Sequence, residues 1–596
     1  MPLSAGLRLR VWRLGLVVLL AACLAACAAS PQRIEQAGEI LRLEQGRIQL
    51  ETTAPSSEPP DLDALLWPGQ GHHLLIIGRG DEALAVRLAM IRAARERIRI
   101  QNYIFYADTA GALLLEELVH AARRGVQVQL LVDSLFSLPD ASVQALLALA
   151  DPNLELRLYN PIFERAVLGN AGFLGAIACC FRSLNHRMHN KLVTVDGRHG
   201  LIGGRNTADR YFDLDTRMNF IDLEVLVSGP VVAAMEAGFE RYWQHRRSRR
   251  TWHTRDVIAA LRDDPPRVLD RLDIERTGFA LAMLDDEQWL PGLIQRRGHR
   301  VGPVEYFSDP PDKPWDKGSE DSTRLLHDLI LSAQQSVLIQ TPYFVMSPRF
   351  ERLLAERDPD VVVTVSSNSL AATDAYPVHA ISRRQRARMV GALDIRYYEA
   401  KPFPANRHHL IPRYSELIAE RAAGFVSPMR GDPAPATRDM PGPRISVHAK
   451  LLVVDQRLSV VTSHNFDPRS EIYNTENGII VDDEDFARAL TEFISPMTEP
   501  PNAWLVAMRS DGEAGMGGLG RRMAHASRRL PTFDLWPHYL TQNYQLPSSI
   551  PAPDRDDPRF HEHWVAVGQA PEVERGQRRI MTSLISRMFG FLWPIM

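Results

Sequence analysis

Cysteine is scarce in this sequence, with four residues in 596, and two of the four lie within the first 27 positions. The other two, Cys179 and Cys180, are adjacent, an arrangement that suits an ordinary disulfide poorly. This scarcity excludes a disulfide framework, and we expect both residues to be small buried side chains. A redox pair formed by the two neighbours is the alternative.

An excess of charge of either sign is also absent, since Lys and Arg number 69, Asp and Glu number 72, and the formal net charge is −3. Domains that bind nucleic acid are usually basic, so we expect no nucleic-acid partner. The arginines nevertheless gather in the segments 246–250, 383–388 and 521–529. Such runs are usually solvated helix faces, but at an anionic membrane they would also attract the lipid surface.

Beyond the N-terminus, no stretch is long and apolar enough to cross a bilayer. The N-terminus itself has three arginines before residue 14, a short apolar run over 14–20, and the tetrapeptide Leu24–Cys27. That tetrapeptide resembles a bacterial lipobox, in which Cys27 is the lipidated residue, and Cys23 is a second candidate. The alternative is an uncleaved signal anchor. We predict a signal segment over 1–27 and a lipid-anchored protein of the bacterial cell envelope that faces the periplasm.

The sequence contains one pattern, H-x-K-x-x-x-x-D, twice, each time followed after six residues by a small-residue turn and an Asn. In order, the copies consist of His189, Lys191, Asp196 and Asn206, and of His448, Lys450, Asp455 and Asn465. A single match would most often be structural. Two matches with the same downstream Asn predict one active site that is built from two homologous halves.

The chemistry of these residue types suits phosphoryl transfer. The motif tails 192–195 and 451–454 are β-branched and apolar, which predicts strands, and positions two apart on a strand share a face. His189 and Lys191 should therefore lie side by side, as should His448 and Lys450. One imidazole would attack phosphorus and the other would protonate the leaving oxygen, while two Lys and two Asn bind the phosphate oxygens. Because the lysines supply the positive charge, we expect no metal and no cofactor.

These residues resemble the phospholipase D superfamily, whose signature is H-x-K-x4-D-x6-G-[GS]-x-N in duplicate. The first copy fits throughout, and the second has Thr462 where Gly is usual. From about residue 65 to residue 500, the sequence is most similar to bacterial cardiolipin synthases of the C type. The similarity is clearest in segments such as 185–191, 222–230 and 465–470.

The resemblance implies a role for each site residue. The first-motif His189 would be the nucleophile that forms a phosphohistidine, and His448 would be the general acid and later the base. A carboxylate would orient each imidazole. We assign Asp222, with Glu224 as the alternative, to His189, and Glu476 to His448. Asp196 and Asp455 are counted with the catalytic motif, although we expect them to stabilise the turn at the strand end.

Each half has the same order of predicted elements, with helices and strands alternating over 81–132 and again over 322–365. This pattern predicts an α/β fold of two homologous α/β/α sandwich domains, each with a mostly parallel central sheet, and an active site at their interface. We predict a flexible tether over 28–64, a first domain over 65–251, a helical linker over 252–305, a second domain over 306–500 and a C-terminal extension over 501–596. The end of that extension, 578–596, would lie in the membrane interface or pack on its own domain.

Three functions fit this sequence. The first is a phosphatidyltransferase that makes cardiolipin from phosphatidylglycerol and a second phospholipid, for which phosphatidylethanolamine is a candidate. The second is a phospholipase D-type hydrolase or, less favoured, a nuclease. The third is an inactive lipid-binding lipoprotein, which is disfavoured because both His, both Lys and both Asn are present. We expect a monomer that carries both halves in one chain, with membrane phospholipids as partners. An unidentified protein of the envelope is a further candidate partner.

Overall fold

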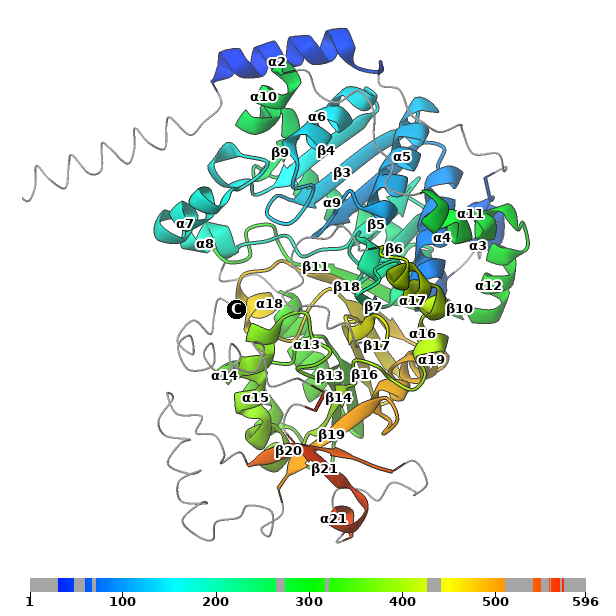
Figure 1. Ribbon diagram of the computed structural model, residues 1–596, viewed down its shortest axis with the longest axis vertical. Helices are drawn as coiled ribbons and strands as arrows, with labels where there is room; N and C mark the ends of the chain where they lie inside the picture. Colours follow the sequence, from blue (N-terminus) through cyan, green and yellow to red (C-terminus); the bar gives the residue numbers. More distant parts are fainter. Residues whose placement is uncertain are drawn as a thin grey trace, which may run out of the picture.

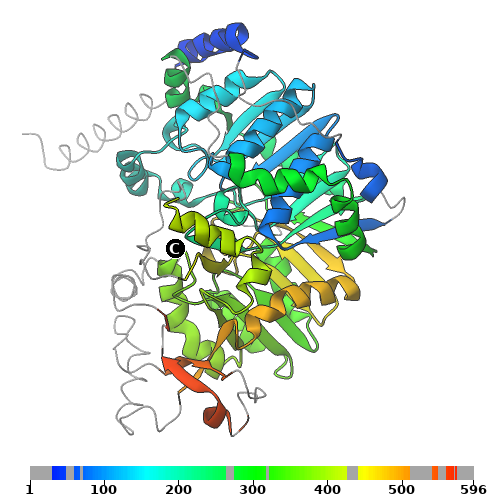
Figure 2. The same cartoon turned by 45° about the vertical axis from the view of Figure 1, so that its right-hand side comes forward.

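The computed structural model describes residues 30–47, 59–66, 71–263, 274–316, 321–425, 441–509, 540–547, 557, 559–568 and 571–572. Figures 1 and 2 show two α/β domains stacked one above the other, the first in blue to cyan and the second in green to orange. The predicted lipidation site at Cys27 or Cys23 and the terminal segment 578–596 lie outside the described residues.

The first domain is built on a nine-stranded sheet in which strand pairing is mixed. Its strands, in spatial order, are β10 (Gly298–Val301), β1 (His72–Ile77), β8 (Glu224–Ser228), β6 (His199–Gly203), β5 (Leu192–Val195), β2 (Arg97–Asn102), β3 (Gln127–Asp133), β4 (Leu154–Tyr159) and β9 (Ser248–Arg250). Only the β2–β3 and β3–β4 pairs are parallel. The helices that accompany it are α4 (Gly80–Ala93), α5 (Thr109–Arg123), α6 (Ala141–Ala150) and α9 (Val231–Trp243).

The second domain repeats this order around a ten-stranded sheet. Its strands are β11 (Val304–Ser308), β18 (Asn477–Asp482), β17 (Leu458–Thr462), β16 (Leu451–Val454), β12 (Ser336–Gln340), β13 (Val362–Asn368), β14 (Arg396–Ala400), β19 (Ala503–Met508), β20 (Thr541–Gln545) and β21 (Val565–Gly568). Its helices include α13 (Ser322–Leu331), α14 (Pro348–Glu356), α15 (Tyr376–Gly391), α17 (Tyr414–Ala422), α18 (Pro468–Ile472) and α19 (Glu484–Ile494).

The predicted α/β class and the two homologous domains are confirmed, but the expected mostly parallel pairing is wrong. Within the two large sheets, parallel pairing is confined to β2–β3–β4 and β12–β13–β14, the strands that helices connect. The motif strands β5 and β16 each form an antiparallel hairpin with the strand that follows. A short turn can join only antiparallel strands, and each motif is followed by such a turn.

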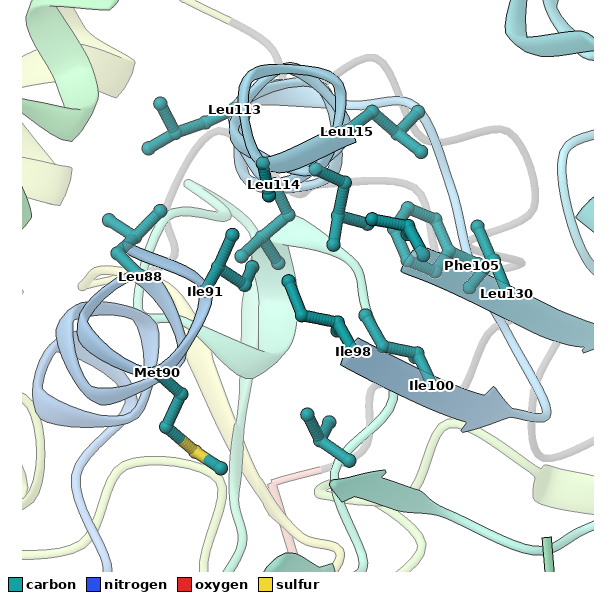
Figure 3. Packing of buried hydrophobic residues seen from close by; sticks show 14 of the residues in the cluster. Leu88, Met90, Ile91, Ile98, Ile100, Phe105, Leu113, Leu114, Leu115 and Leu130 are labelled. Atoms are coloured by element: carbon teal, nitrogen blue, oxygen red, sulfur yellow. The ribbon is translucent and has the colours of Figure 1, made fainter. Parts of the chain in front are cut away.

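The helix–strand units close over apolar layers. In the first domain, side chains of α4 and α5 meet those of β2 and β3, as Figure 3 shows for Leu88, Leu114, Ile98 and Leu130. Because β3 has a strand on each side, residues 130–132 in its second half are apolar in succession and all buried.

One apolar cluster belongs to both domains, so they pack as a single body. It combines residues of β1, β8 and α9 with residues of β16, β18 and α19, among them Leu74, Val225, Phe239, Leu451, Ile479 and Phe486. A shared buried layer of this kind fixes the relative position of the two motifs, because sliding one domain would expose apolar surface.

Several segments outside the two predicted domains join the fold. Residues 31–44, expected in a flexible tether, form α2 (Pro31–Glu44), which Ser30 caps and whose Leu41 is buried. Within the predicted linker, α10 (Arg255–Arg262), α11 (Gly278–Asp285) and α12 (Trp289–Arg297) contact the first domain, and β10 extends its sheet. Strands β19 to β21 extend the second sheet.

The expectation of two small buried cysteines is wrong. Cys179 and Cys180 are joined to each other, and Cys179 is exposed rather than buried. Among the residues that the structure describes, no helix combines the length and apolar character needed to span a bilayer.

Candidate active site

Each motif lies where an irregular segment enters a strand at the centre of a sheet. His189 and Lys191 precede β5, and His448 and Lys450 precede β16, in line with the strands expected from the apolar tails. All four side chains are buried, with the two imidazoles only 4% and 5% exposed. The interface between the domains therefore holds two imidazoles and two amines in a largely dehydrated site.

The motif aspartates stabilise turns, as their position at a strand end suggested. The Asp196 carboxylate accepts hydrogen bonds from the backbone N–H groups of residues 95–97 at 2.8–2.9 Å. Asp455 accepts three at 2.8 Å from residues 334–336. Both aspartates have positive φ, which a residue of this kind tolerates. All of these hydrogen bonds come from the start of the neighbouring strand. Asp196 and Asp455, which were counted with the catalytic motif, therefore have a structural role.

The two domains exchange strand contacts next to each imidazole. Before His448, β15 (Arg444–Val447) pairs in parallel with β7 (Met218–Ile221) of the first domain. The N–H of His448 then donates to the carbonyl of Ile221 at 2.7 Å. In the same way, the N–H of His189 donates to the carbonyl of Thr475 at 2.9 Å. Each imidazole is therefore held beside the residue that follows in the opposite domain, which is Asp222 or Glu476.

The carboxylate partners are consequently crossed, and the predicted assignment within each half is wrong. His189 Nδ1 lies 2.8 Å from Glu476 Oε2, and His448 Nδ1 lies 2.6 Å from Asp222 Oδ2. The alternative partner, Glu224, instead forms a buried ion pair with Arg87. A carboxylate at Nδ1 fixes the tautomer and directs Nε2 towards a substrate.

The two half-sites differ in the motif residue that lies against the carboxylate. Gly204 lies so close to Asp222 that a Cβ at this position would be 2.3 Å from Asp222 Oδ1. In the second half, Ser463 occupies the matching motif position and donates to Glu476 Oε2 at 2.5 Å. Thr462, the departure from the usual Gly, donates its hydroxyl to the carbonyl of Asn477 at 2.8 Å. Thr at this position therefore adds a hydrogen bond at the turn and leaves the reactive groups in place.

Burial is the largest cause of the pKa shifts in this site. It lowers the pKa of His189 well below its ordinary value, and the charges of Lys191 and Lys450 act in the same direction. Burial and Lys450 lower the pKa of His448 to about 4, against the opposing effect of Asp222. Burial raises the pKa of Glu476 to about 7, against the charge of Lys191. These shifts favour neutral imidazoles at neutral pH, and a neutral imidazole is the nucleophilic form.

The two lysines sit beside the imidazoles as expected. Lys191 Nζ donates to the carbonyl oxygen of His189 at 2.6 Å. Lys450 Nζ lies 2.9 Å and 3.2 Å from the two ring nitrogens of His448. Burial lowers the pKa of both lysines, well below the ordinary value for Lys191 and to about 8 for Lys450, although Asp222 and Glu476 oppose this effect.

The two downstream asparagines differ in their contacts. Asn206 donates from Nδ2 to the hydroxyl of Tyr211 at 2.8 Å and accepts from the N–H of Ile104 at 3.2 Å. Asn465 is buried, and its Oδ1 has no hydrogen-bond partner within the described part of the chain. Asn206 thus positions another side chain, whereas the amide oxygen of Asn465, a hydrogen-bond acceptor, has no partner among the described residues.

Two tyrosines complete the site, and sequence reasoning did not assign either to it. The ring of Tyr103 contacts that of His189 edge-on, with centroids 4.6 Å apart. The hydroxyl of Tyr211 lies 3.3 Å from His448 Nε2. Tyr103 follows β2 and Tyr211 follows the first motif, so their proximity to the imidazoles depends on how the loops fold over the sheet edge.

The lowered pKa of Lys450 predicts an alkaline limit on activity. Its ammonium form exists below its pKa of about 8 and is lost as pH rises through that value. If this charge stabilises the transition state, kcat/KM should fall roughly tenfold per pH unit above that pH. A pH–rate profile would measure this, with circular dichroism at each pH to verify folding. A rate that stays constant to pH 10 would contradict the role given to Lys450.

Comparison with known proteins agrees with this geometry. The sequence model of the family described as cardiolipin synthase, PLD-like domain, matches residues 88–243 and 326–497, more than half of the chain. The chain is 29% identical to "Cardiolipin synthase C" of Escherichia coli (strain K12) over 422 residues, which are 69% of this chain and 81% of that protein. It is 22% identical to "Cardiolipin synthase" of Geobacillus sp. (strain WCH70) over 428 residues, 71% of this chain and 66% of that protein.

Among solved structures, phosphatidylserine synthase from Haemophilus influenzae Rd KW20 superposes with a TM-score of 0.48 at 15% identity and covers 78% of this chain and 94% of that one. The duplicated fold and the paired His-Lys motifs define an enzyme of the phospholipase D superfamily, a transferase or phosphodiesterase. Within that superfamily, the chain belongs to the cardiolipin synthase, PLD-like domain family.

Proposed function

We propose that the protein is a phosphatidyltransferase that makes cardiolipin from phosphatidylglycerol and a second phospholipid, through a phosphohistidine on His189. The observation that carries this proposal is the difference between the two imidazoles. The ring of His189 has Glu476 at Nδ1 and no hydrogen bond at Nε2 from any described residue, so this nitrogen is available to phosphorus. Nε2 of His448 contacts the hydroxyl of Tyr211 and lies beside Lys450, a setting for proton transfer.

In the first half-reaction, His189 Nε2 attacks the phosphorus of the donor lipid. The bond between phosphorus and the headgroup oxygen breaks, and His448 gives that oxygen a proton so that free glycerol leaves. When phosphatidylethanolamine is the donor, ethanolamine leaves instead. Splitting the transfer through a covalent intermediate replaces one difficult displacement by two easier ones.

In the second half-reaction, His448 removes the proton from a hydroxyl of a second phosphatidylglycerol. The resulting oxygen attacks the phosphohistidine, the bond between phosphorus and nitrogen breaks, and cardiolipin is released with His189 neutral again. The same imidazole therefore serves first as acid and then as base, which microscopic reversibility requires of a symmetric transfer.

The charges of the site support this cycle. Lys191 and Lys450 would stabilise the growing charge on the non-bridging phosphate oxygens, with Asn465 donating from its amide. Burial and Lys450 lower the pKa of His448 to about 4, too low for a general acid at neutral pH. A bound phosphodiester places a negative charge beside the imidazole, and this charge raises the pKa and favours the protonated form.

The alternative is hydrolysis, in which water takes the place of the second alcohol and phosphatidate is the product. The burial of both imidazoles supports transfer, because water is restricted where the phosphohistidine would form. The names of the cardiolipin synthase relatives support it as well. Action as a nuclease is disfavoured by the net charge of −3.

We also propose that the enzyme works at the bacterial cell envelope as a lipoprotein that faces the periplasm, anchored at Cys27 or else at Cys23. The lipobox-like sequence before Cys27 supports this location. Both half-sites come from one chain, which supports a monomer as the active unit and leaves room for a separate envelope partner.

Lipid product analysis tests the proposed function. The purified full chain would receive phosphatidylglycerol in mixed micelles, with and without phosphatidylethanolamine, beside His448→Ala as control. Cardiolipin that forms with the wild type and is lost in the variant is the expected result, and the dependence on phosphatidylethanolamine identifies the donor. Phosphatidate alone would make the protein a phospholipase, and the absence of any lipid product would overturn the proposal.

A further inference from the structure

Helix α7 (Asn170–Cys179) carries an apolar surface that the first domain leaves uncovered. Its ten residues include no charged side chain, and only Ala176 is buried. Phe173, Leu174 and Ile177 are 42%, 68% and 42% exposed. A helix that is surrounded by water normally presents charged residues on its outer face. An outer face made of adjacent Phe, Leu and Ile indicates contact with another apolar phase.

The position of α7 makes this face accessible. Figures 1 and 2 show α7 and the following α8 (Phe181–Asn185) at the edge of the first domain, where they project from the body in both views. Phe173, Leu174 and Ile177 are spaced so that they occupy one side of the helix. A projecting helix with one coherent apolar side resembles an interfacial element more than a core element.

The surface next to α7 is basic. A cleft of about 460 Å³ beside the end of the helix is lined by Arg246, Arg247 and Arg249. Arg165 precedes the helix and Arg182 follows it, and both are exposed. Asp312 and Glu164 offset part of this charge, the first through ion pairs with Arg246 and Arg247. Five guanidinium groups against two carboxylates leave an excess of positive charge, which suits lipid phosphates.

A series of packed side chains relates the base of α7 to the surroundings of the catalytic imidazole. Ala176 of α7 shares a small apolar cluster with Ile162 and Leu184, and Leu135 packs against that cluster. The ring of Phe136, the next residue in the chain, contacts the ring of Tyr103 with centroids 5.2 Å apart. Tyr103 in turn contacts His189. Helix α7 is therefore anchored in the part of the first domain that also positions Tyr103 against His189.

We propose, on the basis of the function proposed above, that α7 is a membrane-docking helix whose occupant is an anionic phospholipid bilayer. Phe173, Leu174 and Ile177 enter the interfacial region, and the arginines beside the helix bind lipid phosphates. This contact is separate from the expected N-terminal anchor, because it belongs to the catalytic domain and sets which face of that domain meets the lipid. A lipid anchor holds a protein near the bilayer but does not fix which face meets it.

Hydrogen–deuterium exchange tests the contact directly on the full chain. The protein would be bound to vesicles of phosphatidylglycerol with phosphatidylcholine, and to vesicles of phosphatidylcholine alone. Exchange over residues 170–179 should slow by at least about tenfold on the anionic vesicles and much less on the zwitterionic ones. Arg249→Glu should reduce this difference. Equal exchange on both vesicles and in solution would overturn the proposal.

A kinetic comparison connects the contact to turnover. The double variant Leu174→Glu, Ile177→Glu should lose at least about tenfold in activity on phosphatidylglycerol vesicles, because two charges would have to enter the interface. Its activity on dihexanoyl phosphatidylglycerol below the micelle concentration should equal that of the wild type. The matched control is Leu331→Glu, which changes a side chain 45% exposed at the end of α13 in the second domain and should behave as wild type on both substrates.

The outcomes separate this inference from the function on which it rests. If the wild type converts neither the vesicle lipid nor the short-chain lipid, the proposed function fails. If the wild type converts both and the α7 variant matches it on vesicles, the docking role fails while the function stands. A variant that binds vesicles normally but loses a dimer detected by light scattering would assign α7 to a second copy of the chain and overturn the lipid contact.

Discussion

Replacing His189 with alanine should reduce turnover on the order of 10⁴-fold or more, because the nucleophile of the covalent step is removed. The fold should tolerate this change. Glu476, which loses its imidazole partner, already has a pKa that burial raises to about 7, and Ser463 still donates to it. We therefore expect a thermal unfolding midpoint close to that of the wild type, with product measured by lipid chromatography.

A matched control separates loss of chemistry from loss of a buried imidazole. His199 lies on β6 of the same domain, is 3% exposed and contacts Ser228 and Asp63. His199→Ala removes an equally buried ring outside the candidate site, and we expect activity to persist even where stability falls. Substantial turnover by His189→Ala, or an equal loss in both variants, would remove His189 as the nucleophile.

Much of the site could be predicted from the sequence, because local chemistry determines it. The duplicated motif predicted which imidazoles and amines meet, and the apolar tails predicted the strands β5 and β16 that carry them. Asp196 and Asp455 were expected to stabilise turns, and the backbone hydrogen bonds at both carboxylates have that character. These features depend on residues that are close in sequence or on a repeat that the sequence itself shows.

The pairing of strands was harder to predict, since it depends on neighbours distant in the chain. Alternating helices and strands indicated a parallel sheet, and this holds where helices connect β2, β3 and β4. The motif strands are instead followed by tight turns and by strands that return at once, so their ladders are antiparallel. The hairpin signal was present in the turn after Asp196 but was weaker than the overall alternation.

The crossed carboxylates could not be predicted from either half alone. Asp222 and Glu476 occupy similar places after the two motifs, and the sequence contains nothing that states which imidazole each will meet. The answer lies in contacts between the domains, the β15–β7 pair beside His448 and the bridge of Met188 with Thr475 beside His189. Such contacts form only when the shared apolar layer brings the halves together.

The crossed geometry predicts opposite defects for the two carboxylate variants. An activated donor with a nitrophenol headgroup needs no general acid, so the first half-reaction then depends on His189 alone. Asp222→Asn impairs His448 and should give a burst of about one nitrophenolate per enzyme, followed by slow turnover. Glu476→Gln impairs His189 and should give no burst. Both should slow steady-state turnover roughly 10²- to 10⁴-fold, as loss of a tautomer-fixing carboxylate does in other sites.

The covalent intermediate makes this test decisive. Peptide mass spectrometry of acid-free digests of Asp222→Asn should find the phosphatidyl group on His189, where it accumulates because His448 cannot activate the acceptor. The assignment within each half would reverse the pattern, with a burst for Glu476→Gln and none for Asp222→Asn. If that reversed pattern is observed, the modified peptide of Glu476→Gln identifies the premise that fails. A phosphatidyl group on His189 would then contradict the crossed contacts at 2.8 Å and 2.6 Å, and one on His448 would contradict the choice of nucleophile.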